Sequence, residues 1–338
     1  MRRLALYPFA LIYGTIIWLR NLCFDIGLFR SRAIEGKSIC VGNITVGGTG
    51  KSPHVSYLIE QLKERFDIQV LSRGYGRNTK GFILLDRNAS AQQVGDEPLM
   101  LFKLHHTNAQ FAVCENRQYG VQRLRSLNSN SLIILDDAFQ HRWVSAGLNL
   151  MLTTWGRPIR QDALLPSGNL REPISGLKRA HALIVTKCPA FDSVDYQSFI
   201  KDYEKWNIPI FFSRYAYRPL SPLTKNLKDV KEVLIVSAIA HPQFLKGAFD
   251  QEVKTQEISY PDHHTYKASD VSKIHQFFDT FATENTAIVT TAKDWVKIQD
   301  LLSPEDQLKY PWYLLTFELE WQNPIAFNQF INRYVSSN

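Results

Sequence analysis

Residues 38–52 read SICVGNITVGGTGKS, a β-branched run that leads directly into a glycine-rich loop. The glycines let the backbone curl so that its N–H groups point inward at phosphates, and a helix after the loop would turn its positive end toward the same anion. Lys51 adds a point charge, and Ser52 offers a hydroxyl to Mg²⁺. The strict pattern has glycine where this chain has Thr45, but the required context of strand, loop and helix is kept. The candidate nucleotide contacts are Thr45, Val46, Gly47, Gly48, Thr49, Gly50, Lys51 and Ser52.

The second half of a nucleotide site is predicted at 131–137, SLIILDD, where an apolar run leads to two aspartates. Carboxylates at the C-terminal end of a strand can hold Mg²⁺ directly or through water, so Asp136 and Asp137 are candidates. The loop and the aspartates together predict chemistry that depends on ATP or GTP. The guanine-reading pattern Asn/Thr-Lys-x-Asp does not occur, because TKCP at 186–189 lacks the aspartate and TAKD at 291–294 has the wrong spacing. ATP is therefore the predicted nucleotide.

Outward from the loop, short β-branched runs alternate with helical patterns, which is typical of an α/β sheet. The predicted strands lie at 38–45, 68–74, 82–85, 111–114, 131–137, 149–154 and 182–187, and the predicted helices at 51–66, 96–105, 116–127 and 193–206. Parallel strands joined by crossover helices give a doubly wound, mostly parallel sheet, with the ligand site at the C-terminal ends of the strands. The predicted fold class is α/β, similar to the P-loop nucleoside triphosphatases.

Residues 218–226, RPLSPLTKN, carry two prolines and predict a linker. A smaller set of elements follows, with strands at 232–239, 257–260 and 287–291 and helices from His241 and at 268–282. The predicted division is a membrane-interface segment at 1–30, a P-loop domain at 31–219, and a smaller α/β domain at 220–338 that closes over the site.

The composition is that of a globular protein. The length of 338 residues predicts roughly two domains, and 45% hydrophobic with 21% charged residues excludes a disordered tail protein, a collagen or a long coiled coil. The four cysteines lie far apart and form no CxxC pair, so neither a zinc cage nor a disulfide framework is indicated. This usage favours a reducing compartment.

The N-terminal segment combines positive charge with an uncharged apolar run. Residues 1–37 hold six basic and two acidic side chains, a balance of +6 − 2 = +4 out of a net charge of +7. Such a bias suits either nucleic acid or an anionic membrane surface. The apolar run at 4–19 favours the membrane, although as a helix it would span only about 24 Å of a hydrocarbon core of ~30 Å. We therefore expect an interfacial helix pair and no nucleic-acid partner; a buried core helix with basic ends is the alternative.

Seven motifs occur in this order: VGNITVGGTGKSP (41–53), LSRGYGR (71–77), VGDEP (94–98), LDDAFQHR (135–142), LLPSGNLREP (164–173), YPDHHTY (260–266) and TTAKDWVK (290–297). They closely resemble the motifs of the tetraacyldisaccharide 4′-kinase family, the lipid A 4′-kinases of Gram-negative bacteria. Ala138 and Ser167 depart from the usual family pattern, but neither carries a reacting group. The resemblance implies ATP-dependent phosphorylation of the 4′-hydroxyl of a tetraacyldisaccharide 1-phosphate, giving lipid IVA. It also implies a peripheral position at the cytoplasmic face of the bacterial inner membrane, and no obligatory protein partner is inferred.

The resemblance further implies roles for single residues. Asp96 matches the base that takes the hydroxyl proton, and His263 matches the histidine that orients it. Both have simpler interpretations, as the N-terminal cap of a helix at 96–105 and as a loop histidine beside a hinge. Lys51 and Asp137 complete the candidate catalytic set. The candidate Mg²⁺ ligands are Ser52, Glu97, Asp136, Asp137 and Gln140. The candidate acceptor-binding residues are Arg73, Arg77, Arg117, Gln118, His141, Asn169, Arg171 and Glu172, and the residues expected to close over the nucleotide are Lys293 and Asp294.

Two other functional classes fit the same sequence. A membrane-associated P-loop triphosphatase that acts as a switch would hydrolyse ATP at a rate indifferent to glycolipid. A cytosolic small-molecule kinase whose apolar N-terminus lies in the core would be soluble without detergent after lysis. The combination of motifs favours the glycolipid kinase over both.

Overall fold

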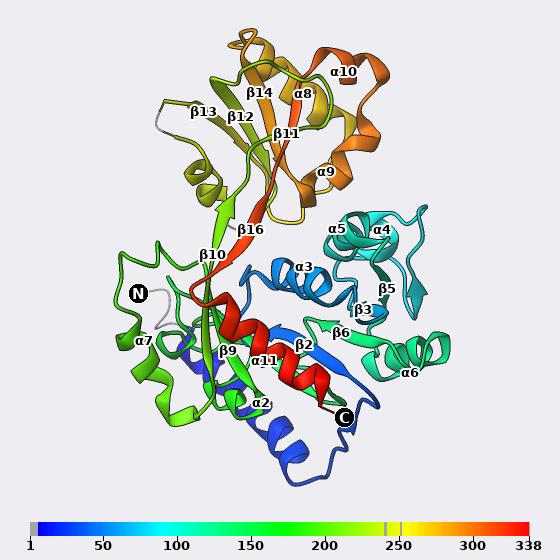
Figure 1. Cartoon of the computed structure of the whole chain (residues 1–338), viewed down its shortest axis with the longest axis vertical. Helices are drawn as coiled ribbons and strands as arrows, with labels where there is room; N and C mark the ends of the chain where they lie inside the picture. Colours follow the sequence, from blue (N-terminus) through cyan, green and yellow to red (C-terminus); the bar gives the residue numbers. More distant parts are fainter. Residues whose placement is uncertain (1–5, 240–241, 251, 338) are drawn as a thin grey trace.

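The computed structural model describes residues 6–239, 242–250 and 252–337. These residues form two units that lie one above the other along the longest axis (Figure 1). One unit is built on a nine-stranded sheet and the other on a five-stranded sheet, and a two-stranded pair joins β1 (Arg32–Ala33) to β7 (Val144–Ser145). We call the unit with the nine-stranded sheet the loop unit and the other the small unit.

The sheet of the loop unit is mostly parallel. In spatial order its strands are β16 (Phe317–Trp321), β10 (Ile210–Tyr217), β9 (Ala182–Thr186), β8 (Leu148–Thr154), β2 (Ser38–Asn43), β6 (Leu132–Asp136), β3 (Ile68–Ser72), β5 (Ala109–Val113) and β4 (Ile83–Leu84). The strands from β10 to β5 run parallel, and only the two edge strands pair antiparallel. Every residue of β2, β3, β6 and β9 is buried, because helices cover both faces of these strands. The predicted doubly wound α/β sheet is confirmed.

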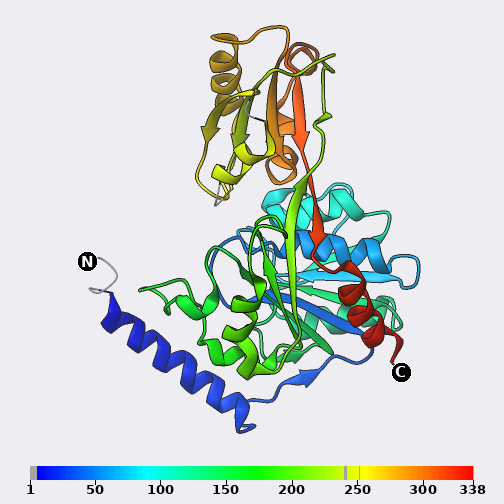
Figure 2. The ribbon, with the colours of Figure 1, turned by 60° about the vertical axis from the view of Figure 1, so that its left-hand side comes forward.

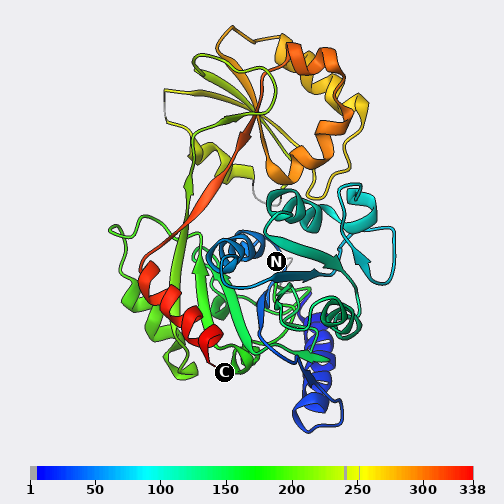
Figure 3. The same ribbon diagram turned by 45° about the vertical axis from the view of Figure 1, so that its right-hand side comes forward.

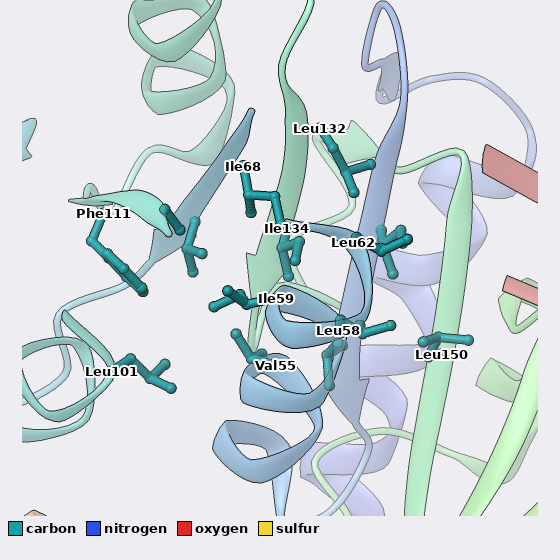
Figure 4. Close-up of a cluster of buried hydrophobic side chains, with 14 of the residues drawn as sticks. Val55, Leu58, Ile59, Leu62, Ile68, Leu101, Phe111, Leu132, Ile134 and Leu150 are labelled. Atoms are coloured by element: carbon teal, nitrogen blue, oxygen red, sulfur yellow. The ribbon is translucent and has the colours of Figure 1, made fainter. Parts of the chain in front are cut away.

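Successive residues of β2 point into two different cores. Ile39 and Val41 belong to a core with α3 (Lys51–Leu62) and α5 (Asp96–His105), whereas Cys40 belongs to a core with α6 (Arg117–Leu127) and α7 (Tyr196–Tyr203). Figure 4 shows the first core, where α3 contributes Val55, Leu58, Ile59 and Leu62. This alternation is what a strand buried on both faces requires. Helix α3, which begins at Lys51 directly after the glycine-rich loop, packs on one of these faces.

The small unit is a second α/β layer. Its strands, in spatial order, are β11 (Ser221–Pro222), β15 (Trp312–Leu315), β14 (Thr286–Thr291), β12 (Glu232–Ser237) and β13 (Lys254–Ser259). Its α-helices are α8 (Ala268–Asp279), α9 (Ala292–Ile298) and α10 (Pro304–Lys309). The helix predicted from His241 is a 3₁₀ segment at Pro242–Ala248 instead of an α-helix, and His241 lies outside the described residues.

The chain leaves the loop unit through β10 and returns to it through β16. These two strands pair antiparallel from Ser213–Trp321 to Tyr217–Phe317 and form the ribbon that joins the units (Figures 1 and 3). After β16, helix α11 (Pro324–Ser336) packs on the core that contains α3. The segment 220–338, predicted as one unit, is therefore divided, because β16 and α11 belong to the loop unit. The sequence analysis left 207–217 and the residues after 297 without elements, so it missed this return.

Among the described residues before β1, the chain forms one α-helix, α2 (Tyr7–Asp25), where a helix pair was predicted. Pro8 does not break it, because proline in the first helical turn removes an N–H that has no partner there. α2 runs along the outside of the loop unit (Figure 2) and exposes a continuous apolar surface: Tyr7, Phe9, Leu11, Ile12, Ile16, Trp18, Leu19 and Leu22. None of the helices in the described part of the chain is long and apolar enough to cross a membrane.

The return of the chain makes a stability prediction. Ile331 of α11 is 2% exposed in the core, whereas Ile325 of the same helix is 68% exposed. Ile331→Ala should lower the free energy of unfolding by about 2–5 kcal/mol, because it removes buried methyl groups and leaves a cavity. Ile325→Ala, the matched control, should change it by less than about 0.5 kcal/mol. Denaturant unfolding measures both, and equal effects would mean that α11 does not belong to the core.

Candidate active site

A cleft of about 1480 Å³ lies where the two units meet. The loop unit lines it with the glycine-rich loop, the C-terminal ends of β3 and β6, and the first turn of α5. The small unit contributes, among others, Asp262, His263 and Lys293. Ligands of open α/β sheets bind at the C-terminal ends of the strands, so this cleft is where the fold places a site.

Hydrogen bonds hold the glycine-rich loop from both sides. Asn43 Nδ2 donates to Thr49 Oγ1 over 2.7 Å, and Thr186 Oγ1 donates to the carbonyl oxygen of Thr49 over 2.8 Å. Gly47 and Gly50 have φ of +97° and +89°, values that favour glycine, and α3 begins at the next residue, Lys51. The loop is therefore anchored next to the positive end of a helix, which is the geometry that binds phosphate groups.

The same loop is tied to the ribbon between the units. His54 Nδ1 lies 2.7 Å from the carbonyl oxygen of Gly50, and His54 Nε2 lies 3.1 Å from the hydroxyl of Ser213 on β10. Burial lowers the pKa of His54 to about 4, so the ring is neutral at pH 7. A side chain at Gly50 would collide with the hydroxyl of Tyr215, also on β10. The ribbon is thus packed directly against the end of the loop.

Two aspartates at the end of β6 face Lys51. Lys51 Nζ lies 3.6 Å from Asp137 Oδ1, and Arg171 donates to Asp137 Oδ2 over 3.1 Å. Burial raises the pKa of Asp137, but Lys51 and Arg171 lower it by more, so the carboxyl remains below its usual range and is ionised. Burial raises the pKa of Asp136 to about 7, and Glu97 and Asp137 add to the rise. A positive charge placed beside this carboxyl would favour its ionised form.

The two carboxylate oxygens of Asp136 differ in their surroundings. Asp136 Oδ2 accepts a hydrogen bond of 3.0 Å from Ser72, whereas its buried Oδ1 has no hydrogen-bond partner among the residues that the structure describes. Such an orphaned buried acceptor is uncommon and calls for an explanation. Glu97 and the hydroxyl of Ser52 line the same cleft. Mg²⁺ prefers carboxylate and hydroxyl oxygens, but no group of three or more histidine, cysteine or acidic side chains among the described residues is arranged to hold a metal ion.

His263 lines the cleft and lies against Asp96, which is not itself among the lining residues, although 167 residues separate the two in sequence (263 − 96). His263 Nδ1 lies 3.5 Å from Asp96 Oδ2, and Lys297 Nζ lies 3.1 Å from the same oxygen. Burial raises the pKa of Asp96, but the hydrogen bond from His263 and the charge of Lys297 outweigh it, so the carboxyl titrates below its usual range. His263 has a φ of +62°, an uncommon backbone conformation for a non-glycine residue. The alternative interpretation placed Asp96 at the N-cap of a helix. In the structure the N-cap is Gly95, and Asp96 is the first residue of α5.

The comparisons with known proteins agree with this site. A family model described as tetraacyldisaccharide-1-P 4′-kinase matches residues 2–336. The chain belongs to the tetraacyldisaccharide 4′-kinase family. It is 37% identical to the tetraacyldisaccharide 4′-kinase of Phocaeicola vulgatus, over 98% of this chain and 95% of that protein, and 38% identical to that of Flavobacterium psychrophilum, over 99% and 97%. A crystal structure described as the "apo" form of LpxK from Aquifex aeolicus in complex with ATP has a TM-score of 0.77 and 28% identity, covering 99% of this chain and 100% of that one.

Membership of this kinase family confirms the resemblance that the seven motifs indicated, and it makes the chain an enzyme. The cleft of a kinase must hold a nucleotide and an acceptor. Some of the predicted acceptor-binding residues line this cleft and others do not. Of the predicted acceptor-binding residues, those that line the cleft are Arg73, Arg117, His141, Arg171 and Glu172. Those that are not among its lining residues are Arg77, Gln118 and Asn169.

Two of the three predicted residues outside the cleft lining, Arg77 and Asn169, are held by bonds of their own. Arg77 is paired with Glu115 and donates to the carbonyl oxygen of Gly81. Asn169 bonds Asp162, and its backbone carbonyl accepts a 2.8 Å bond from the N–H of Val46 in the glycine-rich loop. These contacts make Asn169 a support of the glycine-rich loop, and they do not place it in the cleft where an acceptor would bind.

A predicted acceptor-binding residue inside the lining, Arg117, also has structural partners. Arg117 is 2% exposed and donates to the carbonyl oxygens of Cys114, over 2.9 Å, and of Asp137, over 3.5 Å. Burial lowers its pKa to about 10, which still leaves the guanidinium charged at pH 7. Arg117 therefore joins the segments that follow β5 and β6, and its second bond is made to the backbone of Asp137.

The two residues expected to close over the nucleotide differ in their surroundings. Lys293 lines the cleft and pairs with Asp262 over 2.9 Å. Asp294 is fully buried, accepts a 2.7 Å bond from the hydroxyl of Thr291, and is not among the residues that line the cleft. Its carboxylate is directed into the small unit at the first turn of α9, so a direct nucleotide contact is not supported for Asp294.

Helix α2 forms part of the cleft wall, which the sequence analysis missed. Tyr13 donates to the carbonyl oxygen of Arg171 over 2.7 Å, and Arg20 donates to that of Gln140 over 2.7 Å. The amide of Gln140, a predicted metal ligand, donates to Glu172 over 3.1 Å. Gln140 is thereby built into the wall that joins α2 to the Arg171 loop. The helix with the apolar outer surface is consequently bonded to the segments beside Asp137.

Proposed function

We propose that the chain transfers the γ-phosphoryl group of ATP to the 4′-hydroxyl of a tetraacyldisaccharide 1-phosphate, giving lipid IVA. One observation carries the proposal: the phosphate loop of one unit and His263 of the other line the same cleft, and His263 lies 3.5 Å from the carboxylate of Asp96. Family membership supports the same activity. A switch-type triphosphatase needs no such pair, because water requires no cleft shaped for an alcohol.

The nucleotide half of the mechanism follows from the loop unit. The N–H groups of the loop and the start of α3 would bind the β- and γ-phosphates, and Lys51 would neutralise charge that develops on the transferred group. Mg²⁺, held by Ser52 and the carboxylates of Glu97, Asp136 and Asp137, would supply further neutralisation of the phosphate oxygens. Arg171, which pairs with Asp137, keeps that carboxylate ionised and oriented.

The acceptor half of the mechanism depends on Asp96. Its contacts to His263 and Lys297 are both made through Oδ2, so Oδ1 is the atom to which the 4′-hydroxyl proton would move. His263 would orient the carboxylate and stabilise the proton after transfer. Closure of the small unit over the loop would exclude water, so that the sugar hydroxyl receives the phosphoryl group.

The wall of the cleft supports an amphiphilic acceptor. Arg73 and Arg171 provide positive charge for a phosphate on the sugar. Burial lowers the pKa of His141 to about 4, with the nearby arginines adding to the effect, so its neutral ring is suited to hydrogen bonds with sugar hydroxyls. On the other side of the same wall, α2 presents apolar side chains outward. A lipid whose acyl chains stay in the membrane could therefore extend its sugar into the cleft.

The activity test measures transfer of label from γ-labelled ATP to a tetraacyldisaccharide 1-phosphate. The wild-type chain should transfer label, and Lys51→Ala should lose about two to three orders of magnitude in rate, because a charge at the transferring group is removed. Lys201→Ala, an exposed lysine on α7, is the matched control and should retain the wild-type rate. ATP hydrolysis at the same rate with and without glycolipid would contradict the proposal and support a switch.

We further propose that the enzyme is peripheral at the cytoplasmic face of the inner membrane and that α2 is its anchor. Phe9, Ile12 and Ile16 lie on one face of α2, each about three-fifths exposed. Their spacing of three and four residues places them on one stripe of the helix. Insertion of this stripe into a leaflet would bury apolar surface, with Arg20 held at the cleft by Gln140.

The membrane test replaces this stripe without deleting the helix. The triple variant Phe9→Ser, Ile12→Ser, Ile16→Ser should bind vesicles of phosphatidylethanolamine and phosphatidylglycerol at least about tenfold more weakly, since each buried apolar side chain contributes about 1.5–3 kcal/mol. The control carries Leu127→Ser, Leu308→Ser and Ile325→Ser, which replace equally exposed apolar residues elsewhere. Sedimentation with vesicles measures both. Equal binding by the two variants would show that α2 is not the anchor.

A further inference from the structure

Lys297 is a buried cation at the boundary between the units, and the mechanism above mentions it only as a contact of Asp96. It lies on α9 of the small unit, and its side chain is 6% exposed. Its Nζ lies 3.1 Å from Asp96 Oδ2 in the loop unit and donates over 2.9 Å to the carbonyl oxygen of His264. The sequence analysis quoted the stretch that contains it, TTAKDWVK, but gave Lys297 no role.

The partners of Lys297 account for its burial. An ammonium group has three N–H donors and is costly to bury unless each charge and donor is compensated. Asp96 and the His264 carbonyl take two of these interactions, and Asp294 Oδ1 lies 3.8 Å away. Burial raises the pKa of the Asp294 carboxyl, so the compensating charge for Lys297 is that of Asp96. Asp294 and Lys297 are three residues apart on α9, so both face the same side of the helix.

The hydrogen bond from Lys297 to the carbonyl oxygen of His264 affects the position of His263. The carbonyl oxygen of His264 belongs to the residue directly after His263, so this bond fixes the loop that presents the His263 ring. The other bond fixes the carboxylate that the ring must meet. A single ammonium group therefore holds both members of a pair whose distance is 3.5 Å. Lys293, the other lysine of α9 near Asp96, is directed to Asp262 instead, over 2.9 Å.

We propose that Lys297 is a positioning residue that sets the alignment of Asp96 with His263 across the boundary between the units. This inference rests on the proposed function, because it takes Asp96 as the group that receives the hydroxyl proton. The small unit then contributes more than the His263 ring. It also carries the cation that places the loop unit's carboxylate, so an aligned pair exists only when the two units are closed.

The test compares the rate of turnover with the affinity for ATP. Lys297→Met keeps the length of the side chain but removes its charge and donors, so kcat for glycolipid phosphorylation should fall about 10- to 100-fold, the cost of a misaligned reacting group. KM for ATP should stay within about twofold, because the phosphate loop lies elsewhere in the cleft. Lys297→Arg keeps charge and donors and should recover at least about tenfold of the lost kcat. The matched control is Lys309→Met, which breaks a 3.0 Å lysine–aspartate pair with Asp279 outside the cleft and should leave kcat unchanged.

A second readout separates alignment from a general loss of structure. In an Asp96→Asn background, Lys297→Met should lower kcat by less than about twofold further, since the pair is already broken. If Lys297→Met does not fold, Lys297→Gln, which can still donate one hydrogen bond, replaces it with the same expectations. Unchanged kcat, equal losses in kcat and ATP affinity, or fully multiplicative losses with Asp96→Asn would each overturn the inference. Absence of glycolipid phosphorylation by the wild type would instead contradict the proposed function.

Discussion

The charged contact of Asp96 with His263 and Lys297 is the interaction on which the active site depends, because it brings a carboxylate of the loop unit together with two basic side chains of the small unit. All three side chains are partly or largely withdrawn from solvent, so their interactions are screened less than surface pairs. The cluster is electrostatically consistent: the carboxylate is kept ionised by the cation and the imidazole that face it. A cleft open to water would lose the alignment, although the carboxylate of Asp96 would stay ionised at pH 7.

The ribbon of β10 and β16 makes this contact possible. It joins the units by two paired strands rather than by a loose linker, and its inner end touches the phosphate loop through His54 and Ser213. A movement of the ribbon with the small unit would therefore displace Tyr215, which lies against the loop at Gly50. The fold thus places the hinge, the phosphate loop and the start of α3 in direct contact. Helix α2 extends the arrangement to the outer surface, because it is bonded to the Arg171 and Gln140 segments of the cleft wall.

Sequence reasoning succeeded where the signal is local. The strand, loop and helix at 38–62 follow from β-branched residues, glycines and Lys51 that are adjacent in sequence, and the structure has these elements. The class of fold and the family were likewise readable from short motifs. The proximity of Asp96 and His263 was expected from family resemblance, not from spacing, since 167 residues separate them (263 − 96).

The features that the sequence did not reveal are those decided by distant partners. Apolar periodicity shows that a strand or helix has a buried face but not what covers it, so the return of β16 and α11 to the loop unit was missed. The same limit applies to Lys297 and Asp294, which lie within a recognised motif but whose partners belong to the fold. Tyr13 looked like one more apolar residue of the N-terminal run, and only its bond to the Arg171 carbonyl shows that α2 belongs to the cleft.

The most direct measurement of the central claim is a double-mutant cycle on the pair that spans the units. The rates of glycolipid phosphorylation are compared for the wild type, Asp96→Asn, His263→Ala and the double variant, with ATP affinity measured in each. If the two residues act as one assembled unit, the double variant should lose little more than the more damaging single variant, and ATP affinity should change little. Losses that multiply would contradict the account, because they would mean that Asp96 and His263 contribute independently and that the cleft between the units does not assemble the base.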